Sequence, residues 1–171
     1  MAALLLFLAG CSDDDLYRSE WQTPSTIAVN RLPARASFFP YETEALALEN
    51  NRERSSRFLS LNGTWRFHHA KNPDEAPSRF WEETPPGIEW SEITVPGSWE
   101  LQGFGVPIYL DEEYPFDPDP PKVPHLYNAV GSYLRTFTLP ESWEGERVII
   151  HFGSVRSAMY LWVNGEEVGY A

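Results

Sequence analysis

The chain has 171 residues, enough for one domain of ordinary size with an extended leader and too few for a multidomain enzyme. Its formal net charge of −12, without a stripe of Lys and Arg, argues against nucleic acid as a partner, because binding to phosphates relies on clustered basic side chains. Aromatic residues make up 15% of the chain, more than packing usually requires, and they suit either a packed core or stacking on sugar rings.

The N-terminus carries an apolar segment followed by the single cysteine of the chain. Residues 2–8 are uniformly apolar and run into Leu8-Ala9-Gly10-Cys11, which is similar to the lipobox that ends the signal peptide of a bacterial lipoprotein. We therefore predict a signal peptide with lipobox at 1–11, a lipid on Cys11 that attaches the protein to a membrane, and export to the periplasm or outer membrane of a Gram-negative bacterium. A chance apolar leader is the alternative. The segment is too short for a transmembrane helix, which needs about 20 apolar residues.

Residues 12–58 are predicted to form a linker and an extended arm. They show little alternation of apolar and polar side chains and contain several charges and prolines. Within the arm, the stretch from Glu42 to Arg54 holds enough Ala, Leu and Glu for a short helix or a loop.

The folded part is predicted to span residues 59–171. Residues 64–68 alternate bulky and polar side chains, with Trp65 and Phe67 on the same face, which is typical of a half-buried strand. A surface loop rich in Pro and Glu follows, and residues 88–95 return to a strand-like composition.

Three further segments favour strands. Residues 131–139 are β-prone, and residues 147–152 alternate apolar side chains between two faces, as in a sandwich strand. Asn164-Gly165 is a strong signal for a two-residue hairpin turn, here between strands at 158–163 and 166–170. The predicted fold class is an all-β jelly-roll β-sandwich preceded by the arm.

The four histidines do not form a recognisable metal site. His68, His69, His125 and His151 have no Cys or Glu at the spacing of metal ligands, so we predict no metal ligands in this chain. A packed or hydrogen-bonded role is expected for each of them.

Several short motifs occur in an order that resembles one enzyme family. They are Leu61-Asn62-Gly63-Thr64-Trp65, Val95-Pro96-Gly97-Ser98-Trp99-Glu100, Pro107-Ile108-Tyr109, Tyr114-Pro115-Phe116 and Trp162-Val163-Asn164-Gly165. Over most of residues 24–171 the chain resembles the N-terminal, galactose-binding-like region of the large retaining β-galactosidases of glycoside hydrolase family 2. The resemblance implies that the parent protein hydrolyses terminal non-reducing β-D-galactosyl residues.

The resemblance also implies a site of sugar contact. In the family, the loop after the Pro-Ile-Tyr element offers an Asn side chain to galactose hydroxyls, and the matching residue here is Asp111. An ionised carboxylate only accepts hydrogen bonds, so the contact requires the sugar hydroxyl to be the donor. Tyr109 is a weaker candidate for substrate binding, and a solvated loop acid beside Glu112 and Glu113 is the alternative role for Asp111.

The resemblance places catalysis outside these residues. A retaining glycosidase needs two carboxylates about 5 to 5.5 Å apart, and in the family these glutamates lie in a downstream barrel together with the ligands of Mg²⁺, with Na⁺ as a second candidate ion. The expectations are therefore a fragment without activity of its own, with β-galactosides, the remaining domains of a parent enzyme and further copies of that enzyme as partners. We expect the jelly roll to stop before its final strands, which would leave an unpaired edge at 168–170.

Two alternatives stay open at this point. Other activities of the same family, β-glucuronidase and β-mannosidase, share the jelly roll but do not usually carry the long loop between Pro107 and Phe116. A non-catalytic surface lipoprotein that binds glycans through Trp and Tyr is the alternative outside enzymes.

Overall fold

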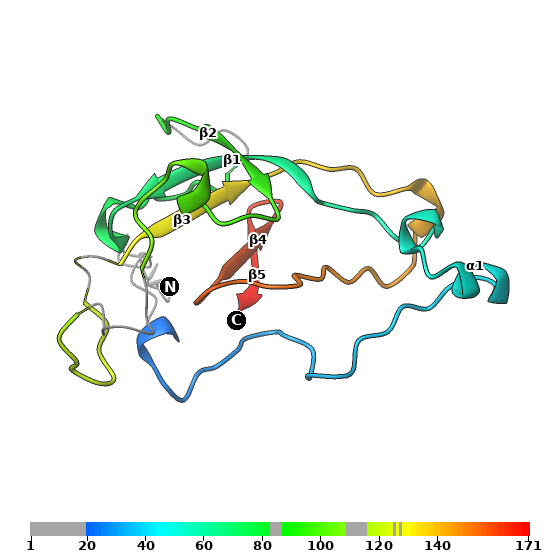
Figure 1. Ribbon diagram of the computed structural model, residues 1–171, viewed down its shortest axis with the longest axis horizontal. Helices are drawn as coiled ribbons and strands as arrows, with labels where there is room; N and C mark the ends of the chain where they lie inside the picture. The colour runs from blue at the N-terminus through cyan, green and yellow to red at the C-terminus, as the bar shows by residue number, and fades with distance from the viewer. Residues whose placement is uncertain (1–19, 83–86, 109–115, 125, 127) are drawn as a thin grey trace, which may run out of the picture.

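The computed structural model describes residues 20–82, 87–108, 116–124, 126 and 128–171. This part of the chain is all-β with little helix, as predicted, and is consistent with a jelly-roll sandwich domain. Its strands form a three-stranded sheet in the order β2-β1-β3 and a two-stranded sheet of β4 and β5 (Figure 1). The strands are β1 (Gly63–Ala70), β2 (Ser91–Val95), β3 (Val130–Leu134), β4 (Tyr160–Val163) and β5 (Glu166–Tyr170).

The larger sheet is built around β1, which pairs antiparallel with both of its neighbours. Phe67 is fully buried, and its ring lies 4.7 Å from that of Tyr133 on β3. Trp65 contacts Tyr133 from the same face at 6.4 Å, while Ile93 of β2, opposite Trp65, is 2% exposed. The predicted strand at 64–68, with its two aromatic residues facing one way, is confirmed.

The smaller sheet is the predicted hairpin. Asn164 and Gly165 both adopt positive φ, 52° and 83°, as a type I′ turn requires. The strands on either side are β4 and β5, with an irregularity in register between Leu161 and Trp162. The hairpin is attached to the loop before β2, because Trp162 stacks on Trp81 with ring centroids 4.5 Å apart and planes 4° from parallel.

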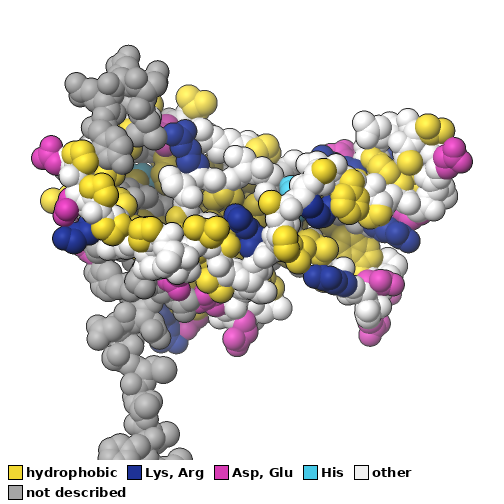
Figure 2. All heavy atoms as spheres, turned by 90° about the horizontal axis from the view of Figure 1, so that it is seen from below, with side chains coloured by type: hydrophobic (Ala, Val, Ile, Leu, Met, Phe, Trp, Pro, Cys, Tyr) yellow, Lys and Arg dark blue, Asp and Glu magenta, His cyan; other side chains and the backbone are white. Residues whose placement is uncertain are grey.

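The prediction of a strand at 147–152 is wrong. These residues are extended but pair with no strand in the described part of the chain, and they appear in Figure 1 as a plain tube leading to β4. Val148 and Ile149, expected on opposite faces, are both exposed, at 45% and 52%. An alternating pattern reports a tendency to be extended, whereas a strand also needs a neighbour for its backbone hydrogen bonds. On the face drawn in Figure 2, many hydrophobic side chains lie at the surface.

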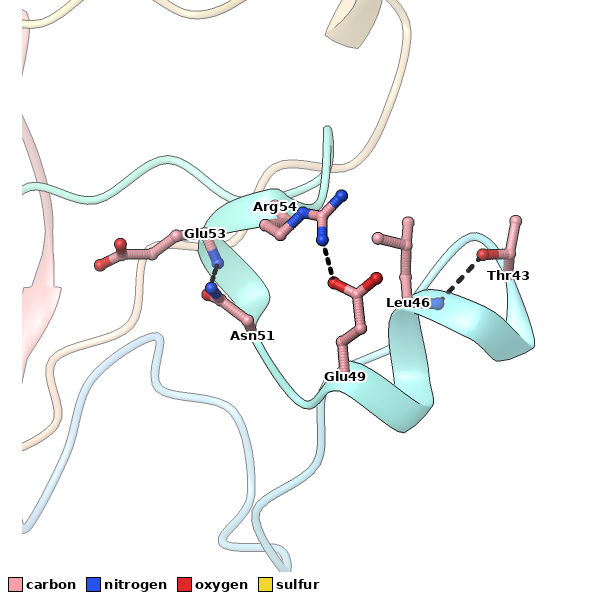
Figure 3. A network of polar contacts seen from close by, with 6 residues as sticks. All are labelled: Thr43, Leu46, Glu49, Asn51, Glu53 and Arg54. Atoms are coloured by element: carbon pink, nitrogen blue, oxygen red, sulfur yellow. Dashed lines mark hydrogen bonds and ion pairs between the residues drawn. The ribbon is translucent and has the colours of Figure 1, made fainter.

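The arm contains a short helix within 42–54, where the composition allowed a short helix or a loop. Helix α1 (Glu44–Glu49) begins after Thr43, whose side chain accepts a hydrogen bond from the backbone N–H of Leu46 (Figure 3). It ends at Asn50 in the left-handed conformation, and the short 3₁₀-helix η3 (Arg52–Arg54) follows. The helix is defined by its caps, because none of its residues is buried.

Glu42 fixes the helical end of the arm. Its carboxylate accepts hydrogen bonds from the hydroxyl of Ser55 and from both the hydroxyl and the backbone N–H of Ser56. The hydrogen bond from the Ser56 side chain is the main reason why the pKa of Glu42 is lowered from 4.5 to about 2. Trp143 donates its indole N–H to the Ser56 carbonyl at 2.7 Å, which ties this end of the arm to a segment far along the chain.

The prediction of an unpaired edge at 168–170 is also wrong, because the arm pairs with this edge. Val29 exchanges two backbone hydrogen bonds with Tyr170, at 2.9 and 3.1 Å, and the side-chain amide of Asn30 donates to the Val168 carbonyl at 2.7 Å. Tyr160 on β4 donates its hydroxyl proton to Glu20 at 3.0 Å. The outer edge of β5 offers backbone donors and acceptors, and an extended arm within reach satisfies them.

Gly169 is the residue that lets the arm approach. A Cβ at this position would overlap the carbonyl oxygen of Val29, so Gly169→Ala is expected to displace the arm from β5. The expected result is faster hydrogen exchange at the Val29 and Tyr170 amides and faster proteolysis within the arm. Gly153→Ala is the matched control, because a Cβ there would meet nothing within 4 Å. Equal exchange in both variants would contradict this role of Gly169.

Candidate functional site

The site residues predicted from sequence, Tyr109 and Asp111, lie outside the described residues, as does Cys11. The structure does describe the chain on both sides of the loop, at 96–108 and 116–124. The candidate site is therefore built from the segments that lead into and out of this loop.

The entering segment is anchored by aromatic residues in the core. The ring of Phe104 lies 4.8 Å from that of Phe67, and Trp99 lies 5.9 Å from Phe67 on the same side of the sheet. Gly131 leaves the space for Trp99, since a Cβ there would come within 2.5 Å of the indole ring. Phe104 thus braces the segment against the sheet.

Other aromatic residues of the described part pack in the same way. Apart from the Phe67 cluster, Phe80 and Trp81 contact Trp162, and Tyr160 contacts Tyr170 at 4.9 Å. Burial is the main cause that raises the pKa of the Tyr160 hydroxyl, so it stays protonated and donates to Glu20. These rings pack on one another, whereas Phe38, Phe137 and Phe152 are exposed, at 67%, 45% and 36%.

The histidines fall in three different surroundings. His68 Nδ1 lies 3.1 Å from the Glu89 carbonyl, and His69 lies among the rings of Trp99 and Phe104, with no hydrogen-bond partner for its buried Nε2. His151 is exposed, and His125 lies outside the described residues. In the ranges that the structure describes, no group of three or more His, Cys, Asp or Glu side chains could hold a metal ion.

The segment that leaves the loop forms a tight proline-rich turn. Asp119 and Lys122 form an antiparallel bridge, and their side chains make an ion pair at 3.4 Å. A cavity of about 120 Å³ lies in this turn, lined by residues 116 and 118–123. Pockets for small ligands usually measure about 300 to 1,000 Å³, so this cavity is too small to be a sugar site by itself.

The all-β fold and the order of the motifs agree with the family resemblance, and a comparison with known families tests it. Residues 58–171 match the family model "Glycosyl hydrolases family 2, sugar binding domain". The chain therefore belongs to this family, which confirms the resemblance seen in the motifs.

Several relatives are named as β-galactosidases. The chain is 41% identical over 157 residues to a β-galactosidase of Priestia megaterium, an alignment that covers 89% of this chain and 15% of that protein. It is 40% identical over 151 residues to a β-galactosidase of Halalkalibacterium halodurans, with 86% of this chain and 15% of that protein covered. A β-galactosidase large subunit of Leuconostoc lactis is 37% identical, with 86% and 26% covered. The chain thus spans about 15% of the length of the first two relatives and about a quarter of the third.

None of the helices at 20–82, 87–108, 116–124 or 128–171 is long and apolar enough to cross a membrane.

Proposed function

We propose that this chain is the N-terminal, sugar-binding part of a β-galactosidase that hydrolyses terminal non-reducing β-D-galactosyl residues with retention of configuration. The observation that carries the proposal is the 41% identity to a β-galactosidase over 89% of the chain. In the parent enzyme this part supplies substrate contact and docks on the remaining domains, and the complete enzyme assembles with further copies of itself.

Catalysis is assigned to other parts of the parent protein. The two carboxylates of a retaining glycosidase must be held on a rigid scaffold about 5 to 5.5 Å apart, which the family resemblance places in a downstream barrel. The family resemblance places Mg²⁺, with Na⁺ as a second ion, in that barrel as well. We assign no catalytic step to a residue of this chain.

The experiment that tests the function begins with the coding DNA beyond Ala171. The expected result is a reading frame that continues into domains with the two catalytic glutamates. The purified product of that frame is expected to cleave a nitrophenyl β-galactoside. Nitrophenyl β-glucuronide and β-mannoside in the same assay separate the other family activities. A stop codon directly after Ala171 would overturn the proposal in favour of a glycan-binding lipoprotein, for which galactose-dependent quenching of Trp fluorescence is the readout.

We also propose that Cys11 is lipidated and attaches the protein to a membrane in the periplasm or at the outer membrane. The support is the apolar segment 2–8 followed by Leu8-Ala9-Gly10-Cys11. Labelled palmitate is expected to be incorporated into the wild-type protein, and Cys11→Ser is expected to abolish the label and release the protein from the membrane fraction. Equal labelling of both proteins would refute lipidation at this residue.

Asp111 is proposed as the residue that contacts the sugar, with Tyr109 as a weaker second. A carboxylate accepts a hydrogen bond from a galactose hydroxyl, so Asp111→Ala in the full-length protein is expected to raise KM for galactosides by about tenfold, the equivalent of about 1.4 kcal/mol of binding. Steady-state kinetics on a nitrophenyl galactoside measure this.

Two further variants separate this contact from a general charge effect. Asp111→Asn keeps an acceptor oxygen and is expected to retain most of the affinity. Glu113→Gln is the matched control, because it removes a neighbouring charge and leaves Asp111 in place. It should leave KM unchanged. An unchanged kcat/KM in Asp111→Ala would refute the contact.

A further inference from the structure

The extended segment at 147–152 has the composition of a strand but no neighbour for its backbone. In the ranges that the structure describes, no backbone hydrogen bond joins it to another segment. It lies between the 3₁₀-helix η6 (Glu141–Trp143) and β4, as the plain orange tube in Figure 1. Its three consecutive β-branched residues, 148–150, favour extended backbone. We call residues 147–152 the open segment.

The open segment exposes a row of apolar side chains. Val148, Ile150 and Phe152 occupy alternate positions and are 45%, 36% and 36% exposed. Phe137 and Leu139, in the extended residues that follow β3, are exposed at 45% and 42%. Single apolar side chains are ordinary at a protein surface, but a row at alternate positions of an extended segment is what a sheet normally buries.

The charge of the chain argues against a second copy as the partner of the open segment. Each copy carries a formal net charge of −12, so two copies repel one another. Within the open segment the polar side chains are those of Arg147 and His151, and there is no acidic residue. Pairing of this segment with itself would therefore form no ion pair between the two strands.

The comparisons favour a partner strand from the same polypeptide. The family model matches residues 58–171, so the open segment belongs to the sugar-binding domain. The match covers only 15% of the β-galactosidase of Priestia megaterium, and most of that relative lies outside it. A strand of the same chain also docks without the loss of translational freedom that a separate molecule must bear.

We propose that the open segment is the docking edge for a strand from a part of the parent β-galactosidase that this chain does not span. The inference rests on the proposed function, because that function supplies the parent protein. The incoming strand provides backbone donors and acceptors to 147–152. Its own uncharged, apolar side chains, at alternate positions, cover Val148, Ile150 and Phe152.

Hydrogen exchange in the full-length protein tests the backbone pairing. The amides of 148–152 are expected to exchange at least about a hundredfold more slowly than in an unstructured peptide of the same sequence, because protection requires a hydrogen-bond partner. The amides of β1 are the reference for a paired strand in the same molecule. Unprotected amides at 148–152, in a protein that cleaves galactosides, would overturn the inference and leave the proposed function standing.

Photo-cross-linking identifies the partner. Benzoylphenylalanine in place of Phe152 in the full-length protein is expected to form a cross-link within one polypeptide, to a peptide beyond residue 171. In place of Ile149, on the opposite face of the open segment, the same group should give little of this product. A cross-link to a second copy, or only to peptides within residues 20–171, would overturn the inference.

Two matched variants of the full-length protein test which face is covered. Ile150→Thr is expected to speed proteolysis within 147–152 about tenfold, because it places a hydroxyl under the docked strand. Ile149→Thr makes the same change on the opposite face and should alter this rate less than twofold. Equal rates in both variants would contradict the burial of the Ile150 face.

The proposed function can fail separately from the docking edge. A full-length protein that shows the cross-link from residue 152 to its own downstream chain, but cleaves no galactoside, would overturn the proposed function and support the docking edge. If Ile150→Thr does not fold, hydrogen exchange and cross-linking still decide the inference, since neither depends on that variant.

Discussion

The burial of Phe67 is the constraint on which the rest of the structure depends. Its ring is fully enclosed on the central strand, and it contacts Tyr133 of β3 together with Trp99 and Phe104 of the segment after β2. Burying one such side chain contributes about 1.5 to 3 kcal/mol, a sizeable share of the stability of a small domain. The same contacts that close this core fix the segment at 99–104, which precedes the predicted loop.

The arm connects parts of the fold that are distant in sequence. At one end Val29 adds to β5 of the hairpin, and at the other Ser56 accepts a hydrogen bond from Trp143. Between these points Leu32 and Phe38 are exposed, 43% and 67%, so the arm is held at its ends and not along its length. The hairpin itself is joined to the larger sheet's loops through Trp162 and Trp81. Edge pairing of the arm and stacking of Trp162 on Trp81 thus connect parts that no continuous sheet joins.

The sequence allowed prediction of the local features and missed those that depend on distant partners. Strand β1 and the Asn164-Gly165 turn follow from alternation and from the need for positive φ, both readable within a few residues. The failed strand at 147–152 and the arm on β5 depend on which backbone lies alongside, and Val29 is far from Tyr170 in the chain. The hydrogen bonds between the Gln102 side chain and the backbone of Thr94 leave no signal in sequence either, because a Gln in a short turn is ordinarily solvated. Asp111 and Tyr109 came from the family resemblance, and they stay predictions.

The charge of the loop bears on the choice among sugars. Asp111, Glu112 and Glu113 are consecutive, and the chain as a whole carries a formal net charge of −12. A uronic acid brings a carboxylate into this field and would be repelled, whereas a neutral galactoside can donate its hydroxyl protons to the same oxygens. If Asp111 contacts the sugar as proposed, the acidic residue at 111 weighs against a glucuronide.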